Sequence, residues 1–177
     1  MGAIAPAVLE LQSTLGQTFP EIFDKIFWDK YWDNGTDTRG KPKPKGKWAP
    51  RLQASAKNPG SKDPHDNGLA LDIFLFKTNW NEWALANELV NVFITNKSIM
   101  GWSSVIYDSV TTDDYGGPKL YTGADKHETH IHIEWPRSRG MTSRGFSYQI
   151  QDQLDMVAVS WRIGELINPS KHDRPVY

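Results

Sequence analysis

The fold of this chain can be approached from one stretch, HDNGLALDIFLF at residues 65–76. Residues 69–76 are apolar except for Asp72, and the run is long enough for one buried strand. A carboxylate in such a strand is costly to bury unless it is paired or binds a cation. Its sequence neighbours are apolar, so its partner must come from elsewhere in the fold. Gly68 permits a sharp turn from loop into strand, which would bring His65 back toward Asp72.

A second stretch, HETHIHIEW at residues 127–135, has the alternation of a strand from residue 130 onward and ends at Pro136. Residues two apart on a strand share a face, so His130 and His132 should point the same way. Two imidazoles on one strand, opposite a buried carboxylate on another, are a ligand set suited to zinc.

Each stretch also has a simpler interpretation. A His-x-His pair can be two surface histidines, and Asp72 could cap a turn or pair with Arg51 or Arg39. However, four of the five histidines fall in these two stretches, and both are attached to apolar strands. This coincidence favours a metal site. The fifth, His172, lies in a polar tail and is expected to be solvated.

The rest of the chain predicts helices around a small sheet. Apolar residues recur at three- and four-residue spacing in Ile22, Phe23, Ile26, Phe27 and Tyr31, which predicts a helix. Further helices are expected over residues 81–97 and 147–167, a strand at 105–107, a Lys-rich exposed loop at 41–47 and a long loop at 111–126. We therefore expect one α+β domain over residues 1–177, with a largely antiparallel sheet. Its parts would be a helical segment (1–33), a long loop (34–66), a metal-binding core (67–136) and a C-terminal helix (147–167).

Composition excludes several classes of protein. The 177 residues carry 20 basic and 21 acidic side chains, a formal charge of −1, so nucleic acid is not an expected partner. Without cysteine there are neither disulfides nor thiolate ligands, and any metal must be held by His, Asp or Glu. Neither a signal peptide nor a membrane-spanning run is recognisable, so membrane insertion is not expected.

The spacing His65-x-x-Gly68-x-Ala70-x-Asp72, followed by His130-x-His132, resembles the zinc signature of a peptidase superfamily. That superfamily unites D-Ala-D-Ala metallopeptidases, murein endopeptidases and the hedgehog signalling domain. The resemblance spans roughly residues 59–135 and implies zinc held by His65, Asp72 and His132.

The extended pattern His127-x-x-His130-x-His132 is most similar to the murein endopeptidase branch. It implies hydrolysis of an amide bond in cell-wall peptide by a zinc-activated water, with His127 and His130 handling the proton and Glu128 as the other candidate base. In the carboxypeptidase branch, an acidic residue stands three positions before the last zinc histidine. Here that position is Thr129, so the sequence departs from that branch.

Two alternatives of another class stay open: a catalytically inactive, hedgehog-like zinc-binding module, or a phage structural domain. If the chain is a peptidoglycan hydrolase, we expect it to be made in the cytoplasm and to act in the periplasm or cell wall. It would arrive there as an endolysin after lysis, on a virion, or as an effector carried by export machinery and matched by an immunity protein.

Overall fold

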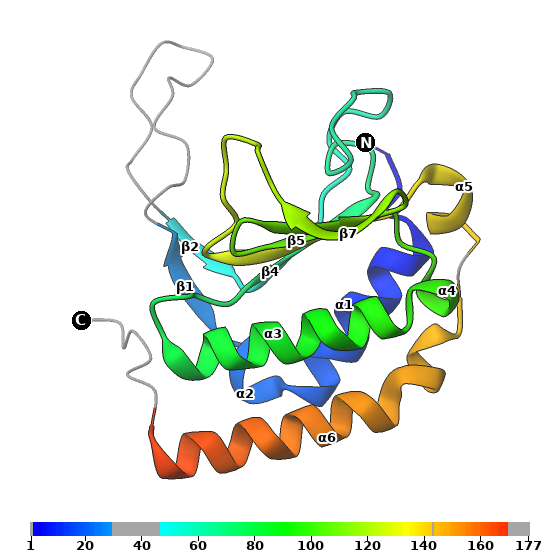
Figure 1. Cartoon of the computed structure of the whole chain (residues 1–177). Coiled ribbons are helices and arrows are strands. Elements are labelled where there is room, and N and C mark those ends of the chain that lie inside the picture. Colours follow the sequence, from blue (N-terminus) through cyan, green and yellow to red (C-terminus); the bar gives the residue numbers. More distant parts are fainter. Residues whose placement is uncertain (1, 30–46, 143, 170–177) are drawn as a thin grey trace.

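The computed structural model describes residues 2–29, 47–142 and 144–169. At its centre lies a six-stranded sheet with the order β3-β4-β8-β5-β6-β7, antiparallel at every pairing (Figure 1). The strands are β3 (Leu52–Gln53), β4 (Ala70–Phe74), β5 (Ser104–Tyr107), β6 (Val110–Asp113), β7 (Gly116–Leu120) and β8 (His130–Glu134). The α+β class and the antiparallel sheet are as the sequence predicts.

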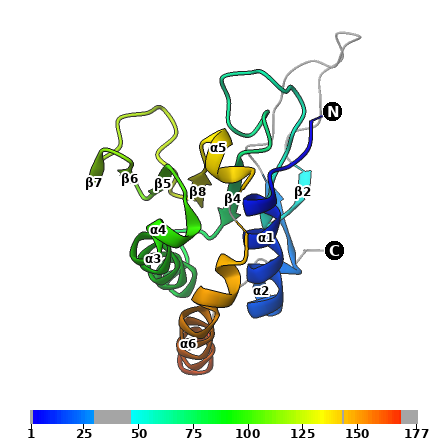
Figure 2. The same ribbon diagram turned by 90° about the vertical axis from the view of Figure 1, so that its right-hand side faces the viewer.

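The long helices lie on one side of the sheet. In Figure 1, α1 (Pro6–Thr18), α3 (Trp80–Thr95) and α6 (Phe146–Ile167) all run below the strands. Figure 2 shows α1 and α3 at the two sides with α6 beneath, and α6 contacts both. Short helices α2 (Pro20–Phe23), α4 (Lys97–Met100) and α5 (Arg137–Gly140) complete the chain. Among the described residues, the three long helices leave the opposite face of the sheet uncovered.

Successive side chains along β4 and β8 point alternately to the two faces of the sheet. Leu71, Ile73, Ile131 and Ile133 are fully buried members of the hydrophobic core on the helix side. The residues between them, such as Asp72, therefore project from the uncovered face. Burial of the apolar set fixes which residues can reach that face.

The N-terminal segment differs from the helix predicted through Tyr31. Helix α2 ends at Phe23, and β1 (Ile26–Asp29) then pairs antiparallel with β2 (Lys47–Pro50) in a separate two-stranded sheet. The β-branched and aromatic residues of β1 favour a strand once a partner strand is present. Tyr31 and the lysines of 41–46 lie outside the described residues.

The predicted loop at 111–126 contains most of β6 and all of β7. Every residue of β7 is exposed, so the segment has no apolar alternation from which a strand could be read. The C-terminal helix agrees with its predicted range within one residue. No helix in the described part of the chain is long and apolar enough to cross a membrane.

Candidate metal centre

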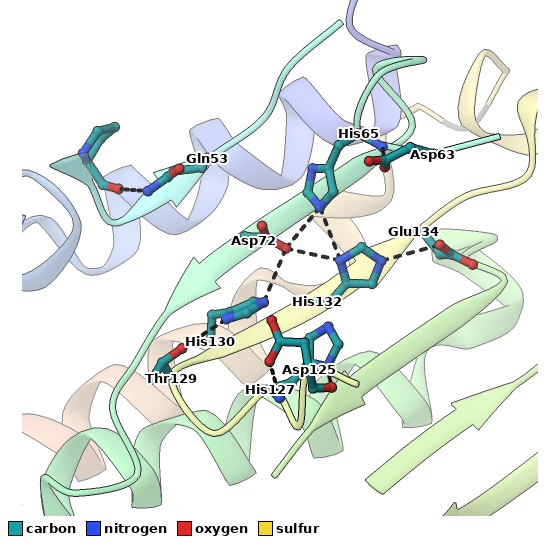
Figure 3. A network of polar contacts seen from close by, with 11 residues as sticks. Gln53, Asp63, His65, Asp72, Asp125, His127, Thr129, His130, His132 and Glu134 are labelled. Atoms are coloured by element: carbon teal, nitrogen blue, oxygen red, sulfur yellow. Dashed lines mark hydrogen bonds and ion pairs between the residues drawn. The ribbon is translucent and has the colours of Figure 1, made fainter. Parts of the chain in front are cut away.

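Asp72 and His132 are brought together by strand pairing. They are direct cross-strand partners in the β4–β8 ladder, and both project from the face without helices. The Oδ1 atom of Asp72 lies 3.0 Å from Nδ1 of His132 (Figure 3). The partner that Asp72 requires thus comes from the neighbouring strand.

His65 joins them through a tight turn. The amide of Gly68 donates to the carbonyl of His65 at 3.0 Å, and Gly68 has a φ of 71°. A Cβ at this position would lie 2.6 Å from the backbone oxygen of Ala3, so the site tolerates only glycine without a shift. The turn places Nε2 of His65 3.1 Å from Asp72 Oδ1 and 3.2 Å from His132 Nδ1.

These three atoms form a nearly equilateral triangle with edges of 3.0, 3.1 and 3.2 Å. Ligands 2.0–2.1 Å from a tetrahedral zinc are about 3.3 Å apart, so the triangle is close to one face of such a tetrahedron. Two imidazoles and a carboxylate are donors that zinc accepts. His65, Asp72 and His132 therefore form a group that could hold a metal ion, as predicted for these residues.

The charges within this group complement each other. Burial raises the pKa of Asp72, but hydrogen bonds from His132 and His65 outweigh it and hold that pKa well below its usual range. Burial lowers the pKa of His132, but hydrogen bonds to Asp72 and Glu134 outweigh it and raise the pKa to about 9. Nε2 of His132 is 3.3 Å from Oε2 of Glu134, an outer contact that keeps Nδ1 turned toward Asp72.

His127 lies beside the triangle in a fixed orientation. It has a φ of 53°, and its backbone N–H donates to Asp125 Oδ1 at 2.9 Å. Its Nδ1–H donates to the carbonyl of Asp125, also at 2.9 Å, so Nε2 is left as the acceptor. Its ring centroid is 4.8 Å from that of His130 and 5.5 Å from that of His132. Burial, and secondly the charge of His130, lower the pKa of His127.

His130 shares the face of His132, as the alternation predicts. Its Nδ1 is 3.1 Å from Thr129 Oγ1, and its Nε2 is 3.7 Å from Asp72 Oδ1. Burial lowers the pKa of His130 despite the nearby charge of Asp72. Its ring lies 5.0 Å from that of Phe74.

Two other residues considered from the sequence lie elsewhere. The side chain of Glu128 is 56% exposed, and its carboxylate contacts Lys77 at 3.5 Å. Arg51 forms a buried bidentate ion pair with Glu82 at 2.8 and 3.1 Å, so it is not the partner of Asp72. Arg39 and His172 lie outside the described residues.

A cleft of about 510 Å³ opens beside His127 and His132. Its lining includes Ser104 and Ile106 of β5 and also Tyr121, whose ring is 5.2 Å from that of His127. Sequence reasoning missed Tyr121, Asp125 and Glu134. Only Glu134 had a readable signal, because it stands two residues after His132 on the same strand face.

Comparisons of the chain with protein-family models, curated proteins and solved structures gave no match. The class of the molecule is therefore defined by its own structure: an α+β domain in which the sheet face opposite the long helices carries His and Asp groups that could bind a metal ion.

Proposed function

We propose that this protein is a zinc-dependent peptidase that hydrolyses an amide bond in the peptide of bacterial peptidoglycan. The observation that carries the proposal is His127, whose Nδ1–H is engaged by Asp125 so that Nε2 is left as an acceptor, beside the His65–Asp72–His132 triangle; His127 and His132 both line the cleft. The motif's resemblance to murein endopeptidases supplies the substrate class.

Zinc would be held by His65 Nε2, Asp72 Oδ1 and His132 Nδ1, and when bound it would polarise the scissile carbonyl and acidify a water molecule. Asp72 contributes the negative charge of the ligand set, and Glu134 fixes the ring of His132. His127 accepts the proton of the attacking water at Nε2 and returns it to the leaving amine. Asp125 keeps the required tautomer of His127, and His130 shares the proton-handling role beside it.

An endopeptidase is preferred to a carboxypeptidase. A carboxypeptidase requires a cation that binds the terminal carboxylate of its substrate. Among the described residues lining the cleft, Lys119 is the one Lys or Arg, and it is paired with Asp113 at 2.7 Å. Asp63 and Glu134 add two more carboxylates to the lining. Such a lining favours cleavage within a chain or cross-link.

The test is digestion of isolated peptidoglycan followed by mass spectrometry of the soluble products, because each bond leaves a product of different mass. We expect peptide fragments from the zinc-loaded protein and none from His132→Ala. Loss of single terminal residues would identify a carboxypeptidase. A folded, zinc-loaded protein that releases nothing would favour the non-catalytic zinc-binding module or a phage structural domain.

The proposed substrate lies outside the cytoplasmic membrane. Production in the bacterial cytosol should therefore be harmless, whereas the same chain fused to a signal peptide should round or lyse the cells. His132→Ala fused to the same signal peptide is the matched control and should be harmless. As part of this proposal, the protein reaches the peptidoglycan after cell lysis, on a virion or through export machinery.

A further inference from the structure

A second group of potential ligands adjoins the first. Asp125, His127 and His130 each offer one ligand atom, and these atoms all lie within 4.8 Å of one another. We propose that they form a second, weaker zinc site, and that zinc bound there inhibits the enzyme. Binding at this site is independent of the proposed function, whereas the inhibition rests on it.

The hydrogen bonds leave suitable atoms for a metal. Nδ1–H of His127 is engaged by the carbonyl of Asp125, so Nε2 is the atom that can coordinate. Asp125 Oδ1 accepts the N–H of His127, and the carboxylate keeps a second oxygen. If His130 coordinates through Nε2, its Nδ1–H can donate to Thr129 Oγ1, which lies 3.1 Å away. Both imidazoles would then have the outer partner usual for a metal-bound histidine.

Geometry makes this site the weaker of the two. The ligand atoms of the first group are 3.0–3.2 Å apart, and those of the second group lie within 4.8 Å of one another. Tetrahedral zinc requires about 3.3 Å between its ligands, a spacing that the first group already has. Nε2 of His130 is also 3.7 Å from Asp72, which places a second cation close to the first and adds repulsion. We expect zinc to bind there about 100-fold or more weakly.

Occupation of this site would remove the proposed base. The lone pair of His127 Nε2 would be bound to the ion and could no longer accept a proton from water. Activity should therefore rise with the first equivalent of zinc and fall as the second binds.

The experiment is a zinc titration of the chelator-treated full chain by calorimetry, with zinc per chain measured by elemental analysis after equilibrium dialysis. We expect two classes of site in the wild type. Asp125→Asn should lose the second class and keep the first, because its amide oxygen still accepts the N–H of His127 but is a poor zinc ligand. Asp152→Asn, an exposed change on α6, is the matched control and should retain both.

Peptide release from peptidoglycan is then compared at about one and about five equivalents of zinc for each variant. Each protein is compared with its own activity at about one equivalent, so a changed basal activity does not enter. On that scale, wild type and Asp152→Asn should lose at least 80% of their activity at the higher level, and Asp125→Asn should lose little. One class of site in the wild type, or an unchanged second class in Asp125→Asn, would overturn the site. Full activity with both sites filled would overturn the inhibition. Two sites without activity at any zinc level would support the site and reject the proposed peptidase.

Discussion

Zinc binding should release about one proton from His132 near neutral pH. The pKa of His132 in the metal-free protein is raised to about 9, so at pH 7 about 99% of the rings carry a proton on the atom facing Asp72. Zinc must displace that proton, and its affinity should therefore rise with pH until the pKa is passed. Each unit below the pKa weakens binding about tenfold, or about 1.4 kcal/mol. The apparent Kd should then be about 100-fold larger at pH 6 than at pH 8. Asp72 is ionised throughout this range and adds no proton.

Calorimetry in two buffers with different ionisation enthalpies measures the proton release directly. A competing chromophoric chelator gives the apparent Kd across pH. Glu134→Gln should weaken the pH dependence in this range, because the hydrogen bond to Glu134 helps to raise the pKa of His132. His132→Ala should lose stoichiometric zinc. An apparent Kd unchanged between pH 6 and pH 8 with wild-type protein would refute the reasoning, since His132 would then be neutral or would not be a ligand.

Three further outcomes are expected. His127→Ala should keep the zinc held by His65, Asp72 and His132 while kcat falls about 10²–10⁴-fold. Glu128→Gln should cost much less because that carboxylate is mostly exposed. The reverse order of effects in peptide-release kinetics would make Glu128 the base. Gly68→Ala places a Cβ 2.6 Å from the backbone oxygen of Ala3, at a residue whose φ is positive. The zinc affinity measured by chelator competition should therefore fall at least about tenfold. An unchanged Kd would show that the turn does not position the ligands. Glu82→Ala removes the bidentate partner of the buried Arg51 and should lower the free energy of unfolding by about 3–5 kcal/mol. In a thermal melt, Tm should fall by about 6–20 °C. A shift under 2 °C would contradict the structural role of the ion pair.

The candidate ligand set could be proposed from sequence because its members stand out locally. Asp72 is the one charged residue in an apolar strand, and His130 and His132 share a strand face by period alone. The orientation of His127 could not be predicted, because it follows from a left-handed backbone and two bonds to Asp125. These are properties of a turn rather than of a repeating pattern.

The parts of the fold that were misjudged have a similar cause. Strand β1 has spacing compatible with a helix, and its pairing with residues 47–50 decides its conformation. Strand β7 is exposed along its whole length and is held by hydrogen bonds to β6, which no apolar alternation reveals. Long-range pairing thus determined what local periodicity left undecided.

The direct pairing of Asp72 with His132 would make binding of the proposed zinc depend on the alignment of β4 with β8. Slipping β4 by one residue against β8 would set Asp72 opposite an isoleucine and turn its carboxylate toward the helices. Only the native alignment assembles all three ligands, so only that alignment gains the free energy of metal binding. At free zinc about 1,000 times the Kd, that gain is about 4.1 kcal/mol, a roughly thousandfold preference. Bound zinc would then favour the native alignment of β4 and β8 during folding, in addition to any part it takes in catalysis.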